Sequence, residues 1–266
     1  MKTIIQKLLL SLLLMTGSVV LPHATQAIVL DWNNVSWTSG SLSTSYDIDP
    51  NNPGNDITIT ITGSTGAFIS GRPEITTDFT GGFGASPSPD NLELWVDFGN
   101  RSQSVTVTVT FSAGYVGGVN DVNFLLFDVD TGSGGGTKTF IDQIRDISAV
   151  SASGGLIAPT ITTSANNSVS GSGTNQVVSG TGENNNSSGA GNVGISFGTN
   201  YITSFTFEYG NPSTGVQKNP DSQSIGLYDI NFKPKVPEVH PGLFAALVSA
   251  FPFLGGLFRR FRTIGK

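Results

Sequence analysis

The sequence predicts an all-β protein, an antiparallel β-sandwich of jelly-roll-like architecture, on three observations. Apolar and polar residues alternate with a period of two in several segments of the middle of the chain. Breaks rich in glycine, asparagine and proline separate these segments, and the 266 residues include 34 glycines and 13 prolines. No segment between residues 28 and 234 has a long helical period. Many short strands joined by such turns are typical of sandwiches.

The alternation places the strands one by one. Isoleucines or valines alternate with threonines in 56–63 and 104–112, and similar apolar faces occur in 92–98 and 201–209. A threonine next to a branched apolar residue suits a sheet with one buried and one solvated face. The segments 122–130 and 224–232 are more continuously apolar, which predicts central strands.

Two stretches are harder to assign. In 139–148 the apolar residues Phe140, Ile144 and Ile147 have helical spacing, but the surrounding β pattern favours a strand or a single turn. Residues 163–192 consist mainly of serine, glycine, asparagine and threonine. This segment is predicted to be a loop, either a flexible insertion or a weak hairpin.

Composition excludes several classes of site. The chain has no cysteine, so it has neither disulfides nor thiolate metal ligands. Its two histidines, His23 and His240, lie in the terminal segments, which leaves the middle without imidazole catalysis or histidine-ligated zinc. A Gly-x-Ser-x-Gly nucleophile elbow would have no histidine to serve it, and the glycine-rich segment 131–139 lacks the Gly-Lys pair of a phosphate-binding loop.

The N-terminus is typical of a secretory signal peptide. Lys2 and Lys7 precede an apolar run from Leu8 to Leu21, and small residues at Thr25 and Ala27 suit a signal peptidase site. We therefore expect residues 1–27 to be a signal peptide, with cleavage after Ala27.

The C-terminus, residues 235–266, has three parts in a fixed order. A proline-containing motif comes first, a short apolar run over 242–258 follows, and a basic cluster ends the chain. The motif and cluster residues are Val236, Pro237, Glu238, Pro241, Arg259, Arg260 and Arg262. The run predicts a short hydrophobic anchor helix, and the basic residues would keep its end in the cytoplasm.

This three-part end resembles the PEP-CTERM class of bacterial sorting signals. The sequence departs from the common motif, because Val239 follows Glu238 where a second proline is usual, so the match is to a Val-Pro-x-x-x-Pro variant. The resemblance implies an exosortase-type processing enzyme as partner, transient anchoring in the inner membrane, and delivery to the cell surface or extracellular matrix. A retained inner-membrane anchor is the alternative.

The net charge of −6 is unevenly distributed along the chain. Residues 28–234 contain eighteen acidic and six basic residues, a net charge of −12, whereas both ends are basic. Nucleic acid and anionic lipid are therefore poor partners for the middle domain, and calcium is a better one.

Carboxylates and tryptophans supply the candidate sites of residues 28–234. Asp128 and Asp130 are two apart, so both side chains leave one face of a strand, and a glycine-rich loop would return Asp142 to them. These three aspartates form a candidate calcium site, although the alternative is a solvated turn. Trp32 and Trp37 are candidates for stacking on a glycan ring, and core packing is the alternative.

The sequence thus favours a non-enzymatic surface or matrix protein with a structural or adhesive role in a biofilm or exopolysaccharide layer. A calcium-dependent carbohydrate-binding module is the second hypothesis. An exported hydrolase is the third, and it would need two of the glutamates to line one cleft.

Overall fold

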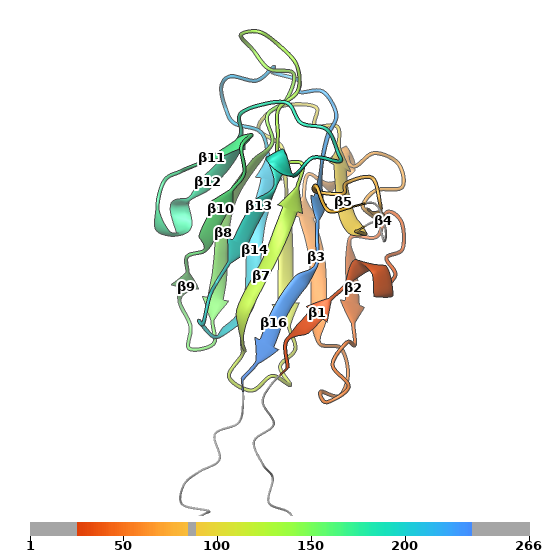
Figure 1. Cartoon of the computed structure of the whole chain (residues 1–266), viewed down its shortest axis with the longest axis vertical. Coiled ribbons are helices and arrows are strands. Elements are labelled where there is room, and N and C mark those ends of the chain that lie inside the picture. Colours follow the sequence, from red (N-terminus) through yellow and green to blue (C-terminus); the bar gives the residue numbers. More distant parts are fainter. Residues whose placement is uncertain (1–25, 85–88, 236–266) are drawn as a thin grey trace, which may run out of the picture. The chain divides into compact units, whose positions relative to one another are not determined.

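A computed structural model describes residues 26–84 and 89–235 (Figure 1). The described residues form one compact unit with its own hydrophobic core. The predicted signal peptide, sorting motif and anchor helix lie outside the described residues and stay predictions. Within the described ranges, no helix is long and apolar enough to cross a membrane.

The described chain is built from sixteen strands and four single-turn 3₁₀ segments, and every pair of strands is antiparallel. The strands are β1 (Ile28–Leu30), β2 (Ser43–Tyr46), β3 (Ile57–Gly63), β4 (Glu74–Thr76), β5 (Asn91–Val96), β6 (Ser104–Phe111), β7 (Val119–Phe127), β8 (Gln143–Ser151), β9 (Leu156–Ile157), β10 (Thr160–Thr163), β11 (Asn167–Ser170), β12 (Val177–Gly180), β13 (Val193–Ser196), β14 (Ile202–Gly210), β15 (Gln223–Leu227) and β16 (Ile230–Pro234). The 3₁₀ segments are η1 (Trp32–Asn34), η2 (Thr65–Ala67), η3 (Gly173–Asn175) and η4 (Gly189–Gly191).

The strands form two layers. One layer has the order β2-β3-β6-β14-β8-β12-β11, with β9 also paired to β8. The other is centred on β7, which pairs with β13 on one side and with β15 and β16 on the other, and these extend to β10, β1, β5 and β4. The layers connect through one β7–β14 pair, Val119 and Ile202.

The path of the chain confirms the predicted sandwich. The long strands alternate between the layers in chain order: β3, β6, β8 and β14 lie in the first, and β5, β7, β13 and β15 follow them in the second. Strands that cross repeatedly between two packed sheets are the hallmark of jelly-roll-like folds. The fold class expected from the alternation is therefore confirmed.

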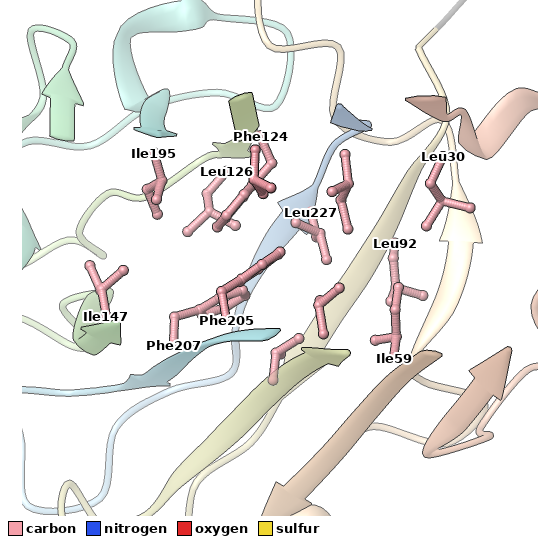
Figure 2. Packing of buried hydrophobic residues seen from close by; sticks show 14 of the residues in the cluster. Leu30, Ile59, Leu92, Phe124, Leu126, Ile147, Ile195, Phe205, Phe207 and Leu227 are labelled. Atoms are coloured by element: carbon pink, nitrogen blue, oxygen red, sulfur yellow. The ribbon is translucent and has the colours of Figure 1, made fainter. Parts of the chain in front are cut away.

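Aromatic and branched side chains from both layers meet in the core (Figure 2). Phe124 of β7 stacks on Phe205 of β14 with ring centroids 4.7 Å apart, and Phe111 of β6 meets Phe232 of β16 at 5.0 Å. Phe111 and Phe205 lie on apolar faces that the alternation predicts, and Phe124 and Phe232 lie in the two continuously apolar segments. Burial of such rings is the main source of stability in a sandwich core.

Three local expectations are resolved. The apolar segment 224–232 is not one strand, because Tyr228 and Asp229 separate β15 from β16. The segment 139–148 begins as a turn and continues as β8. Residues 163–192 contain the hairpin β11–β12, and Val178 of β12 pairs with Ile144 of β8, so the hairpin extends the first sheet.

Candidate functional site

Asp128, Asp130 and Asp142, here called the aspartate cluster, lie where β7 ends and β8 begins. Asp142 is fully buried, and Asp130 is 6% exposed. The Asp142 backbone N–H donates to the Asp130 carbonyl at 3.0 Å, and the Asp130 N–H donates to Asp142 Oδ2 at 3.1 Å. The glycine-rich loop 131–139 thus returns Asp142 to the end of β7, as the sequence predicts.

Protein donors surround both oxygens of Asp142. The Tyr209 hydroxyl donates to Oδ1 at 2.7 Å, and Gln223 Nε2 donates to the same oxygen at 3.0 Å. The Asn184 N–H donates to Asp130 Oδ2 at 2.7 Å, and the Asn184 side chain donates to Asp128 Oδ1 at 3.1 Å. The aspartate cluster therefore fastens the loop around Asn184 and two core strands to the end of β7.

The close approach of β12 is part of this arrangement. A Cβ atom at Gly180 would lie 1.9 Å from the Asp130 carbonyl oxygen, so only glycine fits there. Asp128 has a φ of 61°, which places it in the left-handed region and turns the chain out of β7. The sequence signal for these positions is the Asp-Val-Asp-Thr-Gly run after an apolar strand.

Burial is the first cause that raises the pKa of all three carboxyls. It raises the pKa of Asp128 to about 6 and, together with the charge of Asp128, that of Asp130 to about 7. Burial, and then the charge of Asp130, raises the pKa of Asp142 well above its usual range. The cluster thus holds protons near neutral pH.

The calcium hypothesis stays a prediction. The structure brings its three residues together, but both Asp142 oxygens already accept hydrogen bonds that a cation would have to replace. Within residues 26–84 and 89–235, no group of three or more histidine or carboxylate side chains is arranged to hold a metal ion. The geometry performs a structural task, which is to lock loops together.

The glycan-stacking prediction for Trp32 and Trp37 is wrong. The two side chains are only 1% and 8% exposed, and their rings meet edge to face at 6.5 Å. A regular strand would place these two residues, five apart, on opposite faces. Instead η1 interrupts the strand, and the turn directs both rings into the core, where Trp32 also meets Tyr46.

Exposed aromatic surface lies elsewhere. Phe83 is 47% exposed and stacks on Tyr228 with ring centroids 5.7 Å apart, while Tyr228 stacks on buried Phe127 at 4.9 Å. Tyr228 stands at the break between β15 and β16, which the apolar pattern conceals.

Glu74 and Glu93 form an ion-pair network with Arg72. Glu74 of β4 and Glu93 of β5 are register partners, and Arg72 forms an ion pair with each. Burial raises the pKa of Glu93 even though Arg72 bonds to it. An arginine between the two carboxylates is an ion-pair network, so this pair gives the hydrolase hypothesis no support.

An open pocket of about 420 Å³ lies on the outer side of the second layer. Asn123 of β7 pairs with Ser196 of β13 on one side and with Asn231 of β16 on the other, so three polar side chains form one row. Asp121 and Lys233 complete the polar lining and form an ion pair at 2.9 Å. These five residues are here called the amide pocket.

Backbone irregularity shapes the amide pocket. Asp121 has a φ of 52°, and the register of β16 against β7 shifts between Asn231 and Lys233. Such bulges redirect side chains at sheet edges and near sites. Within the described residues, the side-chain carboxamide of Asn231 has no hydrogen-bond partner in the protein. A sequence signal exists, because asparagine is rare inside strands yet interrupts two apolar runs here.

No protein-family model and no curated protein matches this sequence. Among solved structures, the fold is similar to a family 11 carbohydrate-binding module from Clostridium thermocellum in complex with a β-1,3-1,4-mixed-linked tetrasaccharide. The identity is 14%, the match covers 81% of this chain and 100% of the other, and the TM-score is 0.33. The N-terminal domain of the Streptococcus gordonii adhesin Sgo0707 matches with 9% identity over 84% of this chain and 59% of that one, at a TM-score of 0.31. These values are too low to assign the chain to either group.

Proposed function

We propose that this chain is a non-catalytic surface protein that binds polysaccharide. The observation that carries the proposal is the amide pocket, a hollow lined by carboxamide, hydroxyl, carboxylate and ammonium groups. A carboxamide presents a donor and an acceptor side by side, which matches neighbouring sugar hydroxyls. Asn231 enters this row with its hydrogen-bonding capacity unspent. A small number of convergent polar groups in a preformed hollow is typical of small-ligand sites.

The site of action we propose is the cell surface or the extracellular matrix. The support is the order of sequence features: residues 1–27 are typical of a signal peptide, and residues 235–266 resemble an exosortase sorting signal. An adhesive or structural role in an exopolysaccharide layer follows from a sorted, acidic domain that binds glycan.

Ligand binding tests the first proposal. Residues 28–235 are titrated calorimetrically with neutral and acidic oligosaccharides, beside the double variant Asn123→Ala/Asn231→Ala. We expect the variant to bind at least about tenfold more weakly, because two amides leave the pocket. Asn175→Ala, an exposed asparagine at η3, is the matched control. Equal affinity of the double variant and wild type would remove the pocket from the proposal.

Sorting needs a separate experiment. Deleting the exosortase from the producing strain should leave the protein in the inner membrane with its C-terminal segment intact, as read by fractionation and intact mass. An unchanged location and mass would favour the plain membrane anchor instead.

A further inference from the structure

The outer side of the first sheet carries a regular array of hydroxyl side chains. Threonines occupy every second position of β3 and β6, so Thr58, Thr60 and Thr62 pair in register with Thr110, Thr108 and Thr106. Serines of β2 extend two of these rows on one side, since Ser43 pairs with Thr60 and Ser45 with Thr58. On the other side, Ser204 and Thr206 of β14 pair with Thr110 and Thr108.

The result is two complete rows across four strands, here called the hydroxyl face. One row is Ser45, Thr58, Thr110 and Ser204, and the other is Ser43, Thr60, Thr108 and Thr206, which continues to Ser148 of β8. Strand geometry places neighbours within a row about 4.8 Å apart and the two rows about 6.7 Å apart. The array is therefore periodic in two directions.

The hydroxyls are accessible and partly linked to one another. Every member of the two rows is exposed or half-buried. Between the rows, Ile59, Val109 and Phe205 are buried, and Thr44 of β2 is half-buried. Ser45 Oγ lies 2.8 Å from Thr58 Oγ1, and Ser43 Oγ lies 3.1 Å from Thr60 Oγ1. Such pairs hold the side chains in fixed rotamers, which lowers the entropy lost when a ligand binds.

Charge distinguishes this face from the rest of the domain. The two rows contain no ionisable side chain, although residues 28–234 have a net charge of −12. The neighbouring row of Thr62 and Thr106 ends in Glu208, which forms an ion pair with Arg145. An uncharged polymer meets no repulsion here, whereas a polyanion would be repelled by the domain as a whole.

We propose that the hydroxyl face binds the flat surface of a neutral, hydroxyl-rich polysaccharide in its insoluble form. Each threonine presents a hydroxyl and a methyl group side by side, which complements the alternating hydroxyl and C–H groups of a sugar chain. Regular rows without a hollow suit a repeating surface rather than one short oligosaccharide. The proposal rests on the proposed function for the class of ligand, but it uses the opposite sheet from the amide pocket.

Two sites on opposite sheets would let one molecule contact two polymer chains. Linked sites of this kind raise overall retention far above the affinity of either site alone. The exported domain would then cross-link a polysaccharide layer rather than merely decorate it.

Sedimentation with insoluble neutral polymers tests the proposal. Residues 28–235 are mixed with microcrystalline cellulose, chitin or an insoluble β-1,3-glucan, and the pelleted fraction is measured against polymer mass. We expect Thr60→Lys/Thr108→Lys to lower the partition constant by at least about tenfold, because two ammonium groups then stand in the middle of one row. Thr60→Val/Thr108→Val removes only the hydroxyls and should give a smaller loss.

Controls separate this proposal from the amide pocket. Thr160→Lys/Thr162→Lys carries the same change on exposed threonines of β10 in the other layer and should pellet like wild type. Melting temperatures verify that each variant is folded.

Loss of soluble-oligosaccharide binding in Asn123→Ala/Asn231→Ala, with pelleting reduced but not abolished, is the expected pattern for two sites. The proposal is overturned if wild type pellets with none of the polymers, or if the hydroxyl-face variants pellet as wild type does. If only the pocket variant is without effect, the pocket assignment fails and the hydroxyl face stands.

Discussion

Asp56 and Asp142 are both fully buried, yet their pKa values move in opposite directions. Burial opposes ionisation at both sites. At Asp56 it is outweighed by donors, because the side chain accepts bonds from Asn52, from the N–H groups of Asp49 and Ile48, and from the Tyr115 hydroxyl, and its pKa falls. At Asp142 burial, and then the charges of Asp130 and Asp128, outweigh the donors Tyr209 and Asp130 N–H, and the pKa rises. The balance between burial, hydrogen-bond donors and neighbouring charges decides the charge of a buried acid.

The largest effect is expected from removing Asp56. Asp56→Ala leaves two backbone N–H groups, an amide and a hydroxyl without their acceptor, and we expect the free energy of unfolding to fall by about 4 kcal/mol. Urea denaturation at pH 7 measures it. Asp47→Ala, an exposed acid in the same loop, is the control and should change little. A loss below that of the control would contradict a folding role for this loop.

The pH dependence of stability follows from the raised pKa values of the buried carboxyl groups. Asp128, Asp130 and Asp229, with pKa values of about 6, 7 and 6, bind protons in the folded state at pH values where the unfolded chain has lost them. Stability should therefore fall as pH rises from about 4 to about 7. Asp56 has the opposite sign: its contribution is present above the unfolded pKa and is lost as pH falls through its lower folded value.

Calorimetric scans should thus show a maximum near pH 4 to 5. We expect the melting temperature to be about 5 °C lower at pH 7.5 than at pH 5, which corresponds to about 2 kcal/mol for a domain of this size. A melting temperature that rises over this interval would show that the folded cluster does not retain its protons.

Replacing Asp142 by asparagine separates charge from shape. Asp142→Asn keeps the volume and some of the hydrogen bonds but removes one of the coupled carboxyls, so the decline between pH 5 and 7.5 should shrink by about half. At pH 7.5 we expect the variant to lie within about 1 kcal/mol of wild type. The same scans on Asp142 and Asp56 variants test whether the two sites differ in the way described.

Calcium should have the smallest effect. Because both Asp142 oxygens accept protein hydrogen bonds, we expect millimolar calcium to raise the melting temperature at pH 7.5 by less than about 1 °C relative to chelator. A larger rise that Asp130→Asn abolishes would establish the calcium site that the sequence predicts.

The two-residue periodicity predicted most of the fold, because apolar residues at every second position lie on one face of a strand. Ile57, Ile59 and Ile61 are buried as their alternation predicts, and so are the inward residues of β6 and β14. The position of Asp142 beside Asp130 was also predictable, because the glycine-rich loop 131–139 follows a strand end and lets the chain turn back there. These inferences depend only on local geometry.

Features that depend on contacts distant in sequence could not be predicted in the same way. Trp32 turns inward because its N–H bonds to Asp229, almost two hundred residues away, and because η1 breaks the strand. The amide pocket needs the register of β7 against both β13 and β16. Pairing of this kind is a property of the assembled sheets, which one sequence does not reveal.

The pairing of β1 with β16 has a mechanical consequence. Ile28 lies opposite Phe232, so the chain enters and leaves the described domain at the same end of the sandwich. A pull on Lys235 would run along β16, whose hydrogen bonds to β1 and β7 lie across that direction and would be loaded together, in shear. Shear loading resists force better than peeling bonds one at a time. A domain held at this end would therefore withstand tension on its last strand while its opposite end stays free.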